Sequence, residues 1–368
     1  MSIPVEVLKN RLKRFQEKLS SKNIDAVMLR TLSSYTYFTG TRWLRPALFI
    51  PVEGEPIAFI AKGEEQGFLE RTWIKNIITF IDGADLMGKV TQTIREYKAK
   101  RVGLDFGIER DAFILFYEMF KKLNPHAEVV DVNPILTEMR MIKDDYELKT
   151  IRKAGKIASK AMEKALSVID VGVTETDIAA EAYHTLYKLG SEEPHVYVNI
   201  GPHPRVHSEP FNDVKVREGV FVTVIIGADH NGYYANISRT VFVGSKTGVA
   251  DKALKCTEEA YRLAVELTKP GRKFIEVINA LDKVYEKYQL KDKRVIGYAH
   301  GVGLQIEEPP ITTIVPFHRY MEIKPRMVLA MVHAPIMFEG LGQIKIEDTF
   351  IAVSYTHLRA HETEADLV

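Results

Sequence analysis

A pair of helices that occurs twice in the second half of the sequence restricts the possible fold more than any other feature. Apolar residues at spacings of three and four predict helices across residues 148–190, with a break at Gly172, and again across residues 254–288. Each pair is followed by a segment that carries a histidine, His207 after the first pair and His300 after the second. Two such units predict a pseudo-twofold domain with a binding site between its halves.

Local signals sharpen this prediction. Thr174 and Asp177 have the spacing of a capping box, in which a hydroxyl and a carboxylate satisfy amides in the first turn of a helix. Gly190 has the position of the glycine that follows the end of that helix. Between the two helix pairs, Asn231 and Gly232 favour a type I′ turn between two apolar strands, which predicts a β-hairpin.

The first half of the sequence alternates short apolar segments with amphipathic ones. The segments predicted as strands are residues 24–29, 47–50, 57–60, 77–81, 101–104 and 128–132. Strands separated by helices predict an α/β layer structure. Pro134 interrupts the alternation, so we expect one domain at residues 1–133 and a second at residues 134–353.

Length and charge agree with two domains and exclude several classes of function. The chain has 368 residues, which is more than one core usually supports. Its 50 basic and 49 acidic residues balance to a net charge of +1, which lacks the basic excess of a nucleic-acid-binding protein. Cys256 is the single cysteine, so no disulfide framework is expected. No apolar stretch suits a membrane span or a signal peptide, and we expect a cytoplasmic protein.

Several motifs in order resemble the creatinase, prolidase and methionine aminopeptidase family, whose catalytic domain has the pita-bread fold. They are the hairpin 220–243 with Gly-Tyr-Tyr and Ser-Arg-Thr, the segment His-Gly-Val-Gly-Leu at 300–304 with Glu-Pro-Pro at 308–310, and Lys-Ile-Glu-Asp-Thr at 345–349. Ile-Asp-Ala at 24–26 and residues 35–40 resemble the creatinase-type amino-terminal domain. The resemblance implies an α/β (α+β) chain with a creatinase-type domain followed by a pita-bread domain.

The resemblance also implies a metal site, and the sequence departs from it. Peptidases of the family hold two metal ions with two aspartates, one histidine and two glutamates, because two adjacent dications need anionic oxygen ligands. The aspartate positions fall on Ile225 and Asn236, and one glutamate position falls on His333 or Val332. Isoleucine has no donor atom and asparagine is neutral. We therefore expect a degenerate metal site, with no dinuclear centre and no cofactor.

Two positions of the family's ligand set are kept, as His300 and Glu347. With His333 they could hold a single metal ion, since two histidines and one carboxylate form a known zinc set. In the metal-free alternative, His300 and Glu347 are catalytic and orient substrate and water. Glu347 could instead pair with Arg239 or Lys345, and His300 could be structural, beside a tight glycine turn.

His207 occupies the position of a histidine that family members use beside the scissile bond. In creatinase, which this chain resembles in lacking both aspartates, that histidine is the acid and base of a metal-free hydrolysis. Imidazole suits this role because its ordinary pKa lies near neutrality. We therefore expect His207 to be catalytic, with an ordinary loop histidine as the alternative.

Three further residues are predicted to bind substrate. They are His333, Glu308 and Arg42, and Glu307 stands directly before Glu308 where family peptidases often have another histidine. Arg42 lies where an amino-terminal loop can reach a partner's site in dimeric relatives. The alternatives are that Arg42 is an ordinary surface group and that His333 only fills space.

The last residues of the chain, 354–368, fit neither domain. They have no alternating pattern and look like translated sequencing-adaptor read-through, so we expect a non-native tail that packs poorly.

The sequence thus leads to a hydrolase that cleaves a C–N bond in a small amino-acid-like or dipeptide-like substrate without a metal, with His207 as acid and base. One alternative is a non-catalytic relative that binds a small ligand or a partner in the same cleft. Another is residual Xaa-Pro metallopeptidase activity. Relatives of this two-domain type are commonly dimers, so a homodimer is expected, with no nucleic-acid or membrane partner.

Overall fold

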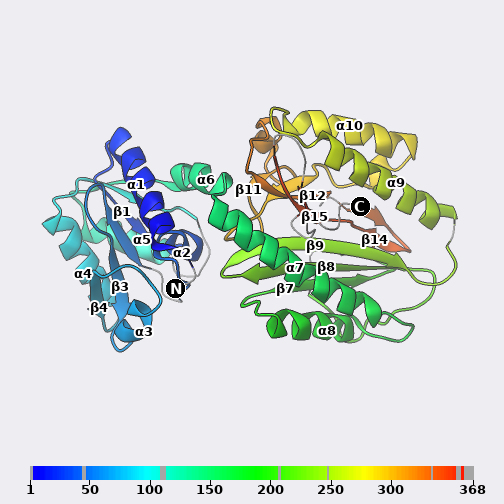
Figure 1. The fold of residues 1–368 in the computed structure, drawn as a ribbon, viewed down its shortest axis with the longest axis horizontal. Coiled ribbons are helices and arrows are strands. Elements are labelled where there is room, and N and C mark those ends of the chain that lie inside the picture. Colours follow the sequence, from blue (N-terminus) through cyan, green and yellow to red (C-terminus); the bar gives the residue numbers. More distant parts are fainter. Residues whose placement is uncertain are drawn as a thin grey trace. The chain divides into compact units, whose positions relative to one another are not determined.

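The computed structural model describes residues 3–43, 47–107, 113–205, 209–246, 248–332, 335–353 and 358–359. The chain divides into two compact units, Met1–Arg140 and Met141–Val368. Each unit has its own sheet structure (Figure 1) and its own core of buried side chains. None of the helices in the described ranges has an apolar stretch long enough to cross a membrane.

The first unit is built on a mixed six-stranded sheet with the strand order β4-β3-β2-β1-β5-β6. The strands are β1 (Ala26–Leu29), β2 (Leu48–Pro51), β3 (Ile57–Ala61), β4 (Ile77–Phe80), β5 (Arg101–Leu104) and β6 (Glu128–Asp131). Strand β1 pairs antiparallel with β2 and parallel with β5. All four residues of β1 are buried, as expected of a central strand that is covered on both faces.

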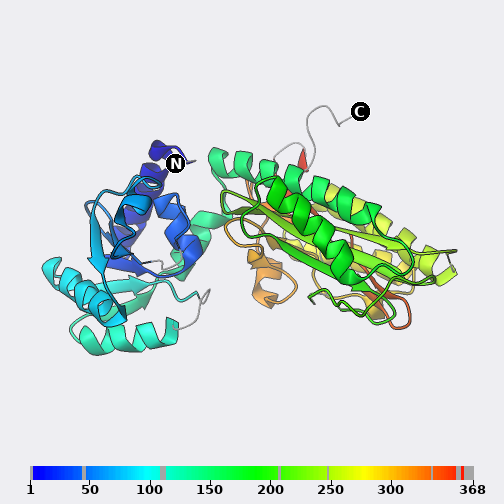
Figure 2. The ribbon, with the colours of Figure 1, turned by 90° about the horizontal axis from the view of Figure 1, so that it is seen from below.

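Helices cover this sheet. They are α1 (Val5–Ser21), α2 (Leu32–Thr39), α3 (Glu65–Leu69), α4 (Gly83–Glu96), α5 (Phe113–Leu123) and α6 (Asn133–Met141). Helices α4 and α5 lie side by side against the strands (Figure 2), and Val90 and Phe120 join the strand residues Met28 and Phe59 in one core cluster. The predicted α/β character of this half is confirmed.

Asp105, directly after β5, is a fully buried carboxylate in the first unit. Its Oδ2 accepts hydrogen bonds from the Thr31 amide at 2.8 Å and the Thr31 hydroxyl at 2.6 Å, and its Oδ1 accepts from the Arg30 amide at 2.9 Å. Burial nevertheless dominates and raises the pKa of Asp105 from 3.8 to about 6. Ionising this group therefore costs the folded state free energy at neutral pH.

We expect the difference in stability between the Asp105→Asn variant and the wild type to depend on pH because of this cost. Between pH 4 and 6 the folded state binds more protons at Asp105 than the unfolded state does, so the stability contributed by this group rises as the pH falls. The free energy of unfolding of Asp105→Asn minus that of the wild type should therefore fall by up to about 3 kcal/mol from pH 7 to pH 4. Urea unfolding followed by the fluorescence of Trp43 and Trp73, both in this unit, measures it.

Asp131→Asn, at an exposed aspartate of the same unit, is the matched control. A difference between Asp105→Asn and wild type that stays constant across this pH range would contradict the prediction.

The second unit contains two helix pairs on opposite sides of its strands (Figure 1). The first pair is α7 (Asp145–Ser167) with α8 (Glu175–Lys188), and the second is α9 (Gly248–Leu267) with α10 (Phe274–Lys287). Each pair packs in a separate core cluster, around Ala158 and Ala182 in the first and around Ala260 and Leu281 in the second. The predicted pseudo-twofold arrangement is confirmed.

Three antiparallel strands follow the first helix pair, in the order β7-β8-β9, and a five-stranded sheet follows the second, in the order β11-β10-β12-β15-β16. Strands β13 and β14 form a separate two-stranded sheet. The bounds are β7 (His195–Ile200), β8 (Phe221–His230), β9 (Tyr233–Phe242), β10 (Ala299–Gly301), β11 (Glu308–Ile311), β12 (Val328–Met331), β13 (Ile336–Phe338), β14 (Gly342–Ile344), β15 (Asp348–Ile351) and β16 (Leu358–Arg359).

The local signals in this unit are confirmed. Thr174 and Asp177 form a capping box at the start of α8, and Gly190 follows that helix with φ +92°. The β8–β9 hairpin turns at Asn231 and Gly232, whose φ angles of 50° and 80° are those of a type I′ turn.

The boundary between the two units lies in a helix. Pro134 is the second residue of α6, a position in the first turn where proline is accepted because the amide it lacks would have no helical partner. The chain therefore continues as a helix through the predicted boundary to Met141. In the tail, the backbone of Leu358–Arg359 pairs with β15, and whether residues 354–368 are native stays a prediction.

Candidate active site

A cavity of about 250 Å³ lies in the second unit between strands that follow the first helix pair and strands that follow the second. Its lining consists of Tyr197, Ile225, Gly227, Asn236, His300, Ile306, Glu307, Lys345 and Glu347. The first four come from β7, β8 and β9, and the others come from β10 and from the segments before β11 and β15. The residues of the two halves therefore meet in one pocket, as the duplicated pattern predicts.

An ion pair dominates the charge of this pocket. Lys345 Nζ lies 2.9 Å from Glu347 Oε2, and both side chains are 1% exposed. Charges removed from water to this degree are tolerated only when they are paired. Of the partners considered for Glu347 from the sequence, the structure thus selects Lys345.

Arg239 has a different partner. Its guanidinium donates to Asp348 Oδ1 at 2.9 Å and to the backbone carbonyl of Glu347 at 3.0 Å. It therefore fixes the main chain at Glu347 and forms its ion pair with Asp348 instead of with the carboxylate of Glu347.

Backbone and hydroxyl hydrogen bonds hold the segment of Lys345 and Glu347 against β9. Lys345 donates its amide to the hydroxyl of Thr240 at 2.9 Å, and that hydroxyl donates to the Lys345 carbonyl at 3.0 Å. Ser238 and Glu347 exchange two backbone hydrogen bonds of 3.0 and 3.2 Å. The side chains at 345 and 347 point to one side of the segment, because side chains alternate along extended backbone.

His300 is buried at 2% exposure and lines the pocket from β10. Its Nδ1 lies 2.9 Å from the carbonyl oxygen of Gly301, which can only accept, so Nδ1 carries the proton. Nε2 is then the nitrogen that holds the lone pair in the neutral ring and can accept a proton or bind an electrophile. The structural alternative raised from the sequence also has support, since Gly301 allows a close backbone approach beside this histidine.

The neighbouring residues Glu307 and Glu308 have different surroundings. Glu308 is 3% exposed and forms an ion pair of 2.7 Å with Lys143, which is 1% exposed. Glu307 lines the pocket, and its Oε1 is buried with no hydrogen-bond partner among the described residues. Sequence reasoning noted Glu307 only as a replacement for a histidine and did not predict it as a site residue.

The remaining polar lining comes from Tyr197 and Asn236. Burial, more than the nearby Glu209 carboxylate, raises the pKa of Tyr197 above its ordinary value, so its phenol stays protonated. Asn236 donates from Nδ2 to the carbonyl of Ile306 at 2.9 Å. This hydrogen bond ties β9 to the loop before β11, which carries Glu307.

The structure brings together two of the predicted site residues, His300 and Glu347, at the pocket. Glu308 is not among the lining residues, and Arg42 belongs to the first unit. His207 and His333 lie outside the described residues. Their predicted roles in catalysis and substrate binding stay predictions.

Comparison with known proteins gives two family matches and a set of relatives, some of which match over nearly the whole chain. Residues 149–353 match Metallopeptidase family M24, and residues 11–142 match the Creatinase/Prolidase N-terminal domain. The chain is 26% identical to the Xaa-Pro dipeptidase of Pyrococcus furiosus, with 98% of this chain and 100% of that one covered. It is 25% identical to the ectoine hydrolase of Halomonas elongata, over 76% of each chain. The prolidase structure from Pyrococcus horikoshii OT3 superposes with a TM-score of 0.86 over 98% of this chain and 100% of that one, at 24% identity.

These matches correct the prediction on cofactors. From Ile225 and Asn236 we expected no cofactor, but the family that matches is one of metallopeptidases and points to a metal cofactor. The expectation is wrong because it took two substituted positions as decisive for the whole family chemistry.

The described residues do not by themselves fit the family's two-metal centre. Ile225 offers no donor atom, the Asn236 amide is neutral, and the carboxylate of Glu347 is held by Lys345. Within the described ranges, which omit His207 and His333, no three His, Cys, Asp or Glu side chains are grouped so that they could hold a metal ion.

The fold and the site support one classification. The helix pairs, the β8–β9 hairpin and the positions of His300 and Glu347 agree with the family match over residues 149–353, which is more than half of the chain. The chain belongs to Metallopeptidase family M24, and a creatinase/prolidase-type domain precedes its catalytic domain.

Proposed function

We propose that this protein hydrolyses a C–N bond in a small, dipeptide-like substrate, as the name Xaa-Pro dipeptidase states for the relative from Pyrococcus furiosus. The observation that carries the proposal is the pocket itself. Its volume of about 250 Å³ lies below the range typical of sites for drug-sized ligands, and it suits a small molecule. Its polar groups, from His300, Glu307, Lys345 and Glu347, converge on one space.

The residues of the pocket can perform distinct tasks in such a reaction. Glu347, paired with Lys345, can accept a hydrogen bond or a proton from an attacking water. His300 presents Nε2 for proton transfer because Nδ1 is held by the Gly301 carbonyl. Tyr197 stays protonated and can donate to a developing negative charge. His207 as the proton shuttle is part of this proposal on the basis of its sequence position.

The comparisons favour the Xaa-Pro peptidase alternative among those raised from the sequence. The named relatives are dipeptidases and hydrolases, so they give no support to a non-catalytic relative and none to a metal-independent reaction. A cytoplasmic location and a homodimer are retained as part of the proposal.

Proline release from Ala-Pro tests the function. We expect the wild type to release proline and Glu347→Gln to lose at least about 100-fold in kcat/KM, because the carboxylate that accepts the proton is gone. Each protein is assayed after chelation and after addition of Mn²⁺, Co²⁺ or Zn²⁺, so that activity is detected whether or not it needs a metal.

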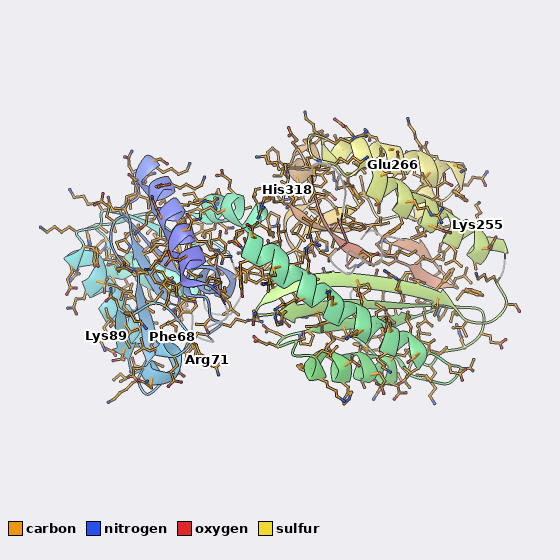
Figure 3. All side chains as sticks on the ribbon, in the orientation of Figure 1. Phe68, Arg71, Lys89, Lys255, Glu266 and His318 are labelled. Carbon is orange, nitrogen blue, oxygen red and sulfur yellow. The ribbon has the colours of Figure 1, made fainter. Side chains whose placement is uncertain are left out.

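Glu266→Gln, at an exposed residue of α9 (Figure 3), is the matched control and should match the wild type. The proposal fails if the wild type releases no proline under any of these conditions, or if Glu347→Gln remains fully active.

A further inference from the structure

The described lining of the pocket contains two carboxylates and one lysine. Lys345 pairs with Glu347 at 2.9 Å, and His300 donates from Nδ1 to the carbonyl of Gly301. Among the described lining residues, no second lysine or arginine accompanies Glu307.

Glu307 also has unused hydrogen-bonding capacity. Its Oε1 is buried and accepts no hydrogen bond from any described residue. A buried acceptor that receives no hydrogen bond raises the free energy of the folded state, because it has lost its hydrogen bonds to water. A charged donor, such as an ammonium group, forms the strongest hydrogen bond to such an acceptor. The neighbouring carboxylate of Glu308 differs in this respect, because Lys143 already satisfies it at 2.7 Å.

The loop that carries Glu307 is fixed at the pocket. Ile306 packs over Gly227, where an added Cβ would lie 2.3 Å from Ile306 Cδ1, and its carbonyl accepts from Asn236 Nδ2. Glu307 follows Ile306 directly, so its carboxylate is presented by backbone that is held on β8 and β9.

We propose that Glu307 binds a protonated nitrogen of the substrate, while Lys345 acts as a positioning residue that holds Glu347. The inference rests on the proposed hydrolysis and assigns Glu307 as the residue that recognises the free amino group of an unblocked dipeptide. A molecule whose amine is acylated leaves the Glu307 carboxylate without its charged partner and binds more weakly.

Two dipeptides that differ in this one group provide the test. Ala-Pro carries an α-ammonium group and N-acetyl-Ala-Pro does not. Affinities are obtained from the rise in the melting temperature of the protein over a series of dipeptide concentrations. Each concentration is high enough that hydrolysis during the scan consumes only a small fraction of the dipeptide. The proteins compared are the wild type, Glu307→Gln and the control Glu266→Gln.

We expect the wild type and Glu266→Gln to bind Ala-Pro at least about tenfold more tightly than N-acetyl-Ala-Pro, which corresponds to about 1.4 kcal/mol. Glu307→Gln should lose this preference by weakening the binding of Ala-Pro alone. Equal affinities of the wild type for the two dipeptides, or equal weakening of both by Glu307→Gln, overturns the inference. So does the absence of binding of either dipeptide by the wild type.

Proline release, measured in parallel, separates the two proposals. If the wild type hydrolyses Ala-Pro and Glu307→Gln does so with an unchanged KM, the inference on Glu307 is overturned and the proposed hydrolysis stands. If Ala-Pro binds through Glu307 but no proline is released, the proposed hydrolysis fails and the ammonium site stands.

Discussion

Replacing Lys345 with methionine should lower the free energy of unfolding of the second unit by about 3–5 kcal/mol at pH 7. The substitution removes the ammonium group that lies 2.9 Å from the carboxylate of Glu347, which is 1% exposed. Breaking a buried ion pair by removing one partner costs far more than the pair itself contributes. Urea unfolding followed by far-ultraviolet circular dichroism measures the loss. The double variant Lys345→Met/Glu347→Gln should be more stable than Lys345→Met, because it also removes the buried negative charge that Lys345 neutralises.

Lys287→Met is the matched control. Lys287 lies 2.8 Å from Glu259, but the two side chains are 62% and 38% exposed, so water replaces the lost contact. The expected loss is below about 1 kcal/mol. A loss in Lys345→Met as small as that in Lys287→Met, or a double variant less stable than the single one, would contradict the role assigned to this pair.

Gly301→Ala should destabilise the same unit by about 3 kcal/mol. A Cβ at Gly301 would lie 2.5 Å from the carbonyl oxygen of Pro309 and 2.7 Å from that of Glu308. Both atoms belong to the backbone of β11, which cannot rotate away as a side chain can. The substitution therefore pushes β10 and β11 apart beside His300, and thermal unfolding and proline release should both show the damage.

Gly248→Ala, at the first residue of α9, controls for the loss of glycine as such. Nothing lies within 4 Å of a Cβ at that position, so the substitution should cause no loss of stability. If Gly301→Ala unfolds at the same temperature as Gly248→Ala, the backbone contact between β10 and β11 is not as tight as described.

Much of the amino-terminal unit follows from local sequence. Every predicted strand there is present within a few residues, because short apolar runs between turn residues have few alternatives in an α/β layer. The strand order β4-β3-β2-β1-β5-β6 does not follow, since pairing between β1 and β5 depends on residues more than seventy positions apart. Helix α2 was not predicted, because its buried Tyr35-Thr36-Tyr37-Phe38 has no amphipathic period; its clearest signal is Gly40, which ends it with φ 76°.

The site was predicted in part for a similar reason. His300 and Glu347 were found through the motifs that contain them, and Lys345 was one of two partners considered for Glu347, beside Arg239. Tyr197 was missed, although strand alternation separates it from the core-facing Val196 and Val198. Glu307 could not be placed from local sequence, because its position depends on the packing of Ile306 over a glycine eighty residues away.

The segment of residues 345–349 also limits how the pocket can change its size. Hydrogen bonds connect β9 to this segment at three successive points: Thr240 to Lys345, Ser238 to Glu347, and Asn236 to Thr349. They join strands from the two halves of the domain beside the pocket. Spreading the halves apart would break this row of hydrogen bonds one after another. The separation of the two halves beside Lys345 and Glu347 is therefore fixed by hydrogen bonding and strand register.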